Sequence, residues 1–147
     1  LQHFLYISQV KPENMVILMQ ADVWEKILWG KKWNKTSVLS LFVSKKCHVR
    51  EVIKVPKENF IPAPKVESSV VLFESHNLYQ DVDDTGFLEL IKKGFSQPRK
   101  KLIKNLIQGW YQKETLEIYF AENHFDENLR GEDLSTQEWI NMFLAIW

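Results

Sequence analysis

An aromatic residue followed by two closely spaced prolines is the first feature of this sequence that could take part in chemistry. Phe60 precedes Pro62 and Pro64, and Lys65 follows directly. Proline fixes φ at roughly −65° and biases the residue before it towards extended geometry, so residues 61–64 are predicted to form a stiff, polyproline-like loop. Such a loop can present one aromatic ring to a flat ligand, such as a nucleobase. The residues alone favour packing of Phe60 in the core, because aromatic side chains are usually buried.

A second candidate site is a run of basic residues with no acidic residue among them. Its members are Lys92, Lys93, Arg99, Lys100, Lys101 and Lys104. We expect a helix over residues 99–108, beginning after Pro98, on which Lys100, Lys101 and Lys104 share one face. The apolar residues Leu102, Ile103 and Leu106 would point inward. The basic face can neutralise phosphates, in contacts that depend on salt but not on base sequence. An ordinary solvated helix face is the alternative.

The residue types that most often bind metals or act as nucleophiles are scattered along the chain. Cys47 is the only cysteine, which excludes an internal disulfide, and it is predicted to be a packed small residue. Asp81, Asp83 and Asp84 lack the glycine and the distal glutamate of a calcium loop, so they are interpreted as part of a solvated linker. The histidines have no metal-ligand spacing and are predicted to be surface or packing residues: His3, His48, His76 and His124. The sequence therefore predicts no metal site.

Sites for nucleotides are equally sparse. The chain has no Gly-x-Gly turn between a strand and a helix, so we expect no binding of a dinucleotide or S-adenosylmethionine by that device. Trp24, Trp29 and Trp33 lie among lysines and could stack on bases, but packing at a helix end is the favoured interpretation. No residue of this chain is predicted to be catalytic.

The hydrophobic pattern divides the chain into an α/β part and a helical part. Residues 14–20 form a continuous apolar run typical of a strand buried on both faces. Residues 49–55 and 66–73 are predicted to be two further strands, which the Phe60 loop joins into an antiparallel edge on an otherwise parallel sheet. A polar linker is expected over residues 75–84, and only helices follow it.

Helices are predicted from periodicity and from capping residues. Thr36 or Ser37 can cap one helix, Asp84 or Thr85 another, and Ser135 with Glu138 forms a capping box for the last. Residues 1–10 are interpreted as the end of a helix, and residues 30–35 as a basic loop. The other predicted helices cover residues 21–28, 37–46, 85–95, 99–108 and 115–121.

Composition is that of an ordinary globular protein. An apolar content of 45% supports a core and argues against disorder, while 19 basic and 19 acidic residues give no net field to attract nucleic acid. The neutral total hides an acidic segment, residues 114–138, whose only basic residue is Arg130. The single cysteine, the absence of a secretory signal and the lack of an apolar run of about 20 residues lead us to expect a cytoplasmic protein without a membrane span. Because the chain begins at Leu1 inside a predicted helix, we expect it to be a fragment.

Four segments, taken in chain order, carry a recognisable pattern: Met15–Ile27, Phe60–Val71, Phe95–Leu106 and Leu129–Trp139. In order and spacing they resemble the rRNA adenine N6-dimethyltransferase family of the KsgA/Erm type. The first is similar to the family's strand-then-helix unit, the second to its Phe-x-Pro-x-Pro-Lys-Val-x-Ser loop, the third to its Phe-Ser-Gln-x-Arg-Lys helix and the fourth to the signature of its last helix. Together they are specific and span nearly the whole chain.

The resemblance implies the C-terminal half of a class I (Rossmann-like) α/β methyltransferase sheet, followed by a small all-α domain. Residues 1–74 would be the distal half of the catalytic domain, 75–84 a linker, and 85–147 a helical rRNA-binding domain. The implied activity is N6,N6-dimethylation of adenines in small-subunit rRNA during ribosome biogenesis, with S-adenosylmethionine as the donor. Phe60 would stack on the extruded adenine, in a loop formed with Pro62, Pro64 and Lys65. The implied contacts with the RNA backbone come from Arg99, Lys100, Lys101 and Lys104.

The sequence also departs from the family pattern. It lacks the glycine-rich donor-binding loop, the acidic residue for the ribose and the Asn-Leu-Pro-Tyr tetrapeptide that faces the Phe60 loop. We therefore expect this chain alone neither to bind S-adenosylmethionine nor to methylate RNA. The alternatives are a truncated RNA-binding or ribosome-assembly module without catalysis, and an Erm-type enzyme acting on large-subunit rRNA. The third segment and the Lys-Val-x-Ser residues of the second favour the KsgA type.

Overall fold

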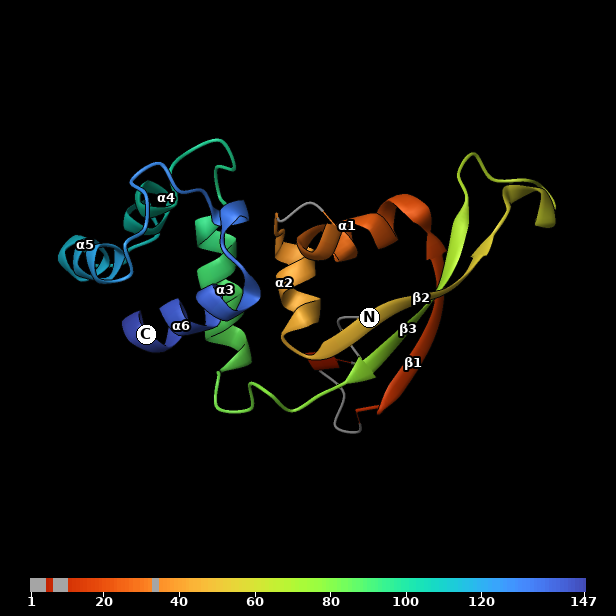
Figure 1. The fold of residues 1–147 in the computed structure, drawn as a ribbon, viewed down its shortest axis with the longest axis horizontal. Coiled ribbons are helices and arrows are strands. Elements are labelled where there is room, and N and C mark those ends of the chain that lie inside the picture. Colours follow the sequence, from red (N-terminus) through yellow and green to blue (C-terminus); the bar gives the residue numbers. More distant parts are fainter. Residues whose placement is uncertain (1–4, 7–10, 33–34) are drawn as a thin grey trace.

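The computed structural model describes residues 5–6, 11–32 and 35–147, with an α/β part first in the chain and a helical part after it (Figure 1). Of the helix predicted over residues 1–10, only Leu5 and Tyr6 are described. Expectations for His3 and Trp33 lie outside the described residues, as does that for the side chain of Trp29.

Within the described residues, the strands β1 (Asn14–Gln20), β2 (Cys47–Val55) and β3 (Ser68–Ser75) form one sheet with the order β1-β3-β2. Strand β3 pairs antiparallel with both neighbours, so the antiparallel pairing predicted for residues 49–55 and 66–73 is confirmed. The parallel remainder of the predicted sheet has no counterpart among the described strands. A register shift between Glu51 and Ile53 interrupts the β2–β3 ladder.

Two helices cover one face of the sheet: α1 (Ala21–Lys32) and α2 (Val38–Ser44), both visible beside it in Figure 1. Trp24 and Ile27 of α1 are buried there, which confirms the packing interpretation of Trp24. Ser37, one of the two residues predicted to cap this helix, caps α2. Its backbone N–H donates to Ser40 Oγ, and its hydroxyl oxygen accepts from Ser40 N–H. Helix α1 runs to Lys32, so the loop predicted from residue 30 starts too early.

The opposite face of the sheet is open. Val16 and Leu18 of β1 are 67% and 51% exposed, although Met15 on the inner face is buried. The prediction that residues 14–20 are buried on both faces is therefore wrong. Among the described residues no helix covers this outer face, and β1 has a partner on one edge only.

The helical part packs around Trp139, which is fully buried together with Leu102, Leu106 and Leu116. The capping box predicted at the last helix is confirmed, since Ser135 N–H donates to Glu138 Oε2 at 2.7 Å and Glu138 N–H donates to Ser135 Oγ at 3.2 Å. The helices are α3 Asp84–Gly94, α4 Leu102–Gln108, α5 Lys113–Glu122 and α6 Thr136–Ile146, and the short 3₁₀ turns are η2 Lys57–Asn59 and η3 Gly131–Asp133.

The segment predicted to be a polar linker, residues 75–84, is largely exposed, but it also makes specific contacts with the α/β part. Val82 is 4% exposed, and the fully buried Lys45 donates from Nζ to Val82 O at 2.8 Å. Asp84 pairs with Lys45 and with Lys46, and it lies in the first turn of α3. The cap of that helix is Asp83, which accepts from Gly86 N–H at 2.6 Å, and neither Asp84 nor Thr85.

A second set of contacts joins the two parts through the segment after α1. Thr36 N–H donates to Glu132 O at 2.7 Å, and the Thr36 hydroxyl donates to Leu134 O at 2.9 Å. Lys35 Nζ forms ion pairs with Glu132, at 3.1 Å, and with Asp133. These bonds hold η3 and the start of α6 against the end of the α1–α2 connection.

Candidate functional site

The Phe60 loop connects β2 to β3 and projects beyond the end of the sheet that is remote from the helical part (Figure 1). Phe60 is half-buried, and its backbone N–H donates to Lys57 O at 3.2 Å. The loop is not a continuous polyproline-like segment, because bends occur on both sides of Pro64. The Ile61–Pro62 peptide bond is cis. The turn η2, which sequence reasoning missed, leads into Phe60.

The end of this loop is fixed against the start of α1. Ala21 N–H, the first of the helix, donates to Glu67 O at 2.9 Å, and Ser68 pairs with Gln20 in the sheet. The C-terminal end of the Phe60 loop is therefore anchored to the junction of β1 and α1.

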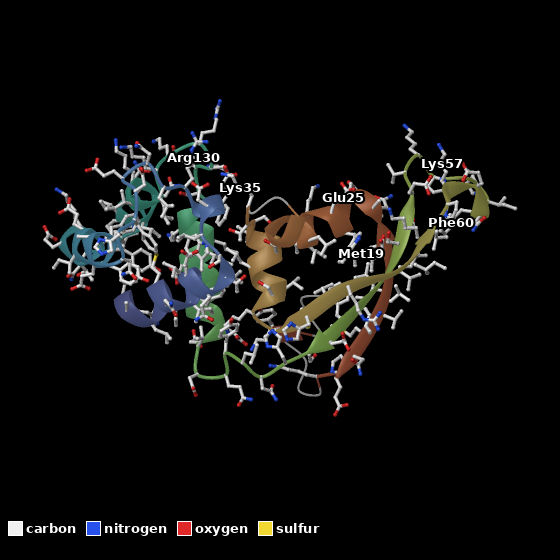
Figure 2. The ribbon with its side chains drawn as sticks, in the orientation of Figure 1. Met19, Glu25, Lys35, Lys57, Phe60 and Arg130 are labelled. Atoms are coloured by element: carbon white, nitrogen blue, oxygen red, sulfur yellow. The ribbon has the colours of Figure 1, made fainter. Side chains whose placement is uncertain are left out.

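Three exposed lysines lie close to Phe60 in the sequence, on the same loop or at the end of the strand before it: Lys54, Lys57 and Lys65. Figure 2 shows Lys57 and Phe60 at the same end of the molecule. Lys57 was not among the predicted site residues, although its position three residues before Phe60 in a proline-bounded segment was available as a signal. An aromatic ring on a loop that also carries exposed lysines suits a nucleotide, since the ring can stack on the base and a lysine can contact a phosphate.

The basic segment has a different shape from the predicted one. Helix α4 begins at Leu102, so Arg99 and Lys100 lie in an exposed turn before it and Lys101 is its N-cap residue. The prediction that Lys100, Lys101 and Lys104 share one helix face is wrong. The turn closes through Lys100 N–H, which donates to Gln97 O at 2.9 Å. Burial of Leu102 and Leu106 is as expected.

A buried asparagine shapes this turn. Asn105 is 1% exposed, and its Nδ2 donates to Gly94 O at 2.7 Å and to Gln97 O at 3.0 Å. Phe95 stacks on Trp139 with ring centroids 5.8 Å apart. These residues of the third segment therefore act as a scaffold that presents Arg99 and Lys100 to solvent.

Arg130 joins the basic turn from the acidic segment. Leu102 N–H donates to Leu129 O at 2.7 Å, which brings residue 130 beside the start of α4 although it is far away in sequence. Arg130 is exposed, and its backbone N–H donates to Asp133 Oδ2 at 2.8 Å. In Figure 2, Arg130, Lys35 and Lys57 follow the upper edge of the molecule. The basic turn is hereafter Arg99, Lys100, Lys101 and Arg130.

The groups that could supply nucleophilic or metal chemistry occupy packed or surface positions. Cys47 is 3% exposed, and burial raises the pKa of its thiol, which disfavours the thiolate. His48 is exposed, and its ring lies 4.6 Å from that of half-buried His76. Burial lowers the pKa of His76. Within the described residues, no three potential ligands gather to hold a metal ion.

The two candidate sites are thus separate. The Phe60 loop lies at one end of the sheet, and the basic turn lies on the helical part, with α1 between them (Figures 1 and 2).

In the described part of the chain, no helix is both long and apolar enough to span a bilayer.

Comparisons with known proteins agree on one family. Residues 2–146 match the family model described as ribosomal RNA adenine dimethylase. Ribosomal RNA small subunit methyltransferase A of Crocosphaera subtropica is 30% identical over 127 residues, which are 86% of this chain and 47% of that protein. The protein of the same name from Alkaliphilus metalliredigens is 32% identical over 140 residues, covering 92% and 48%. This chain therefore spans about half the length of such relatives.

Solved structures show the same fold at lower identity. A dimethyladenosine transferase from Plasmodium falciparum matches with a TM-score of 0.73 at 19% identity, over 95% of this chain and 60% of that one. The 23S rRNA methyltransferase ErmE matches with a TM-score of 0.65 at 15% identity, over 91% and 55%. The predicted partial α/β methyltransferase fold is confirmed by these matches.

Proposed function

Because the chain belongs to the ribosomal RNA adenine dimethylase family, we propose that it forms part of an enzyme that methylates adenine N6 in ribosomal RNA. The observation that carries this proposal is the Phe60 loop, which bears a half-buried aromatic ring and exposed lysines and is anchored at its end to β1 and α1. Adenine N6 is inaccessible in stacked RNA, so the base must be extruded, and an aromatic ring can then hold it by stacking.

We further propose small-subunit rRNA, in a pre-ribosomal particle, as the substrate. Relatives at 30–32% identity are named small subunit methyltransferases. The likeness to ErmE, a 23S rRNA enzyme, is at 15% identity and supports only the fold. The large-subunit alternative is therefore the weaker one.

In this proposal the chain supplies RNA contacts rather than the donor site. Phe60 stacks on the adenine, Lys57 and Lys65 contact neighbouring phosphates, and the basic turn and Lys104 contact the backbone elsewhere. S-adenosylmethionine would supply the methyl group. The described residues do not fit that cofactor, because β1 passes directly from Gln20 into α1 at Ala21 with no glycine turn, so no methyl-transfer step is derived from them.

Calorimetry tests the part of the proposal that concerns the cofactor. We expect no heat of binding when S-adenosylmethionine is titrated into the 147-residue chain, and a binding isotherm at micromolar affinity would contradict the proposal that the donor site lies outside it.

From the family membership we also propose a division into domains. Residues 1–74 belong to the catalytic domain, and residues 85–147 form the RNA-binding domain.

RNA affinity tests the part that concerns the substrate. Fluorescence anisotropy with a labelled rRNA hairpin should show binding that weakens with salt. The double variant Arg99→Gln/Lys100→Gln should reduce the slope of log affinity against log salt by about 0.7–0.9 for each phosphate that these side chains neutralise in the wild type. Lys11→Gln, an exposed lysine in the α/β part, is the control and should leave the slope unchanged.

The second candidate function is an RNA-binding or assembly module without catalysis. The observation that favours it is that the basic turn is complete within this chain, from residues 97–105 and 129–130. Tight rRNA binding by the isolated chain, together with no methyl transfer after mixing with the N-terminal half of a relative, would favour the module over the enzyme.

A further inference from the structure

A groove between α4 and α5 lies next to the basic turn and shares Lys101 with it. Its volume is about 490 Å³. Lys101 and Lys104 line it from the α4 side, and Glu117, Phe120 and Ala121 line it from α5. Phe125 and Glu127, which follow α5, complete the lining.

Part of the lining of this groove is built by the way α5 ends. His124 has φ of 53°, in the left-handed region, which turns the chain back onto the helix. Phe125 N–H donates to Phe120 O at 3.0 Å and His124 N–H to Ala121 O at 3.1 Å. The ring of Phe125 then packs edge-on against that of Phe120, at 5.5 Å, and stays half-buried. One aromatic ring is thereby held in the lining of the groove.

The groove is lined by charges of both signs. Lys104 is exposed, and Lys101, which also belongs to the basic turn, is half-buried. Glu117 pairs with Lys113 at 3.5 Å, whereas Glu127 forms no ion pair with any described residue. A ligand that carries both an anionic group and a hydrogen-bond donor matches these charges.

We propose that this groove binds one unpaired nucleotide of the RNA. Its phosphate lies against Lys101 and Lys104, its base packs on Phe125, and Glu127 accepts a hydrogen bond from an exocyclic amine. Carboxylates accept from cytosine N4 in direct readout, and aromatic side chains stack on bases of any kind. The inference rests on the proposed RNA-binding function and adds a base-selective contact to a docking surface that otherwise reads only phosphates.

Hairpins that differ in one bulged position test the proposal on the 147-residue chain. The three probes carry a bulged cytidine, a bulged uridine or an abasic bulge in the same stem, and affinity is measured by fluorescence anisotropy. We expect the cytidine hairpin to bind about tenfold more tightly than the uridine hairpin, because uridine cannot donate a hydrogen bond to the charged carboxylate from that position. The abasic hairpin should bind more weakly than both, because it has no base to stack on Phe125.

Matched variants identify the residues responsible. Glu127→Gln should abolish the preference for cytidine over uridine, while Glu122→Gln, an exposed glutamate of α5 outside the groove, should keep it. Phe125→Leu, which preserves an apolar side chain, should reduce the difference between the cytidine and abasic hairpins. Circular dichroism confirms that each variant is folded.

The outcomes separate this inference from the proposed function. If the chain binds no RNA, both are wrong. If all three hairpins bind with equal, salt-dependent affinity, or if Glu127→Gln keeps the cytidine preference, only the groove inference is wrong. If a cationic aromatic peptide occupies the groove while the hairpins bind alike, the groove is a peptide site and the inference is again wrong.

Discussion

Single residues of the family segments serve mainly to position other residues. Asn105 holds two backbone carbonyls that precede the basic turn, and its own Oδ1 is buried without a partner among the described residues. The basic residues Arg99 and Lys100 of the third segment are exposed as predicted, but the role of its asparagine is structural. No pattern in the sequence states which carbonyls an asparagine will bind.

Replacing Asn105 should therefore destabilise the helical part. Asn105→Ala leaves Gly94 O and Gln97 O without their donor, and the expected decrease is about 2–3 kcal/mol in the free energy of unfolding. Urea denaturation followed by tryptophan fluorescence measures it. Ser96→Ala, at an exposed neighbouring position, is the control and should cost less than about 0.5 kcal/mol. An unchanged midpoint for Asn105→Ala would contradict the scaffold role.

Asp84 gives a pH dependence to the contact between the two parts. Burial raises the pKa of Asp84, but hydrogen bonds and charge from Lys45 and Lys46 outweigh it, so the pKa lies below its ordinary value. The stabilisation that the pairs of Asp84 with Lys45 and Lys46 give the folded protein is therefore fully present above pH about 3.9, the ordinary pKa of an aspartate. It is lost as the pH falls through the lowered pKa of Asp84. Asp84→Asn should be less stable than wild type at pH 7, because buried Lys45 loses its partner.

The difference in stability between the wild type and Asp84→Asn should become smaller below pH 4. Thermal unfolding between pH 2.5 and 7 measures it, and Asp81→Asn, at an exposed residue, should follow the wild-type curve throughout. A constant difference across this range would show that the carboxylate charge does not matter.

At the scale of elements, helix ends depart most from the sequence expectations. Both α4 and α5 end with a residue in the left-handed region, Trp110 at φ 78° and His124 at φ 53°. Trp110 N–H donates to Ile107 O and Tyr111 N–H to Leu106 O, a Schellman closure. Gly109, which suits the left-handed position, lies one residue too early and takes an ordinary φ of −82°.

Trp110→Gly should stabilise the protein. The left-handed conformation costs a non-glycine residue about 1–2 kcal/mol, whereas Trp110 is 91% exposed and contributes little burial. Glycine also loses more chain entropy on folding, so the expected net gain is about 0.5–1 kcal/mol by chemical denaturation. Trp110→Ala removes the same ring without relieving the backbone and should show no gain. Equal stability of the two variants would contradict this explanation.

The molecule as a whole exposes one side of its sheet. Val16, Leu18 and Ile53 are each more than half exposed on β1 and β2, and the outer edge of β1 is unpaired among the described strands. An exposed apolar face beside a free edge is a site for association with another chain. This chain also spans only about half of the relatives it matches, so its relatives have residues with no counterpart here.

The isolated chain is therefore expected to self-associate through β1. The double variant Val16→Lys/Leu18→Lys places charges on this strand and should remain monomeric where the wild type shows a sedimentation coefficient that rises with concentration. Ile118→Lys, at an exposed apolar position of α5, is the matched control and should associate like the wild type. A wild type that stays monomeric at all concentrations would contradict the prediction.

The sequence by itself determined the strands, most helices and the caps at Ser37 and Ser135, because periodicity and capping are properties of neighbouring residues. The sequence also contained the four segments that identify the family, and it predicted that Arg99 and Lys100 are exposed to solvent. Only the tertiary structure decided that α4 starts at Leu102 and that Arg130 joins the basic turn, because a backbone hydrogen bond to Leu129 fixes both. The open outer face of β1 was decided at the same level, since burial depends on which elements lie opposite a strand and not on the strand's own residues.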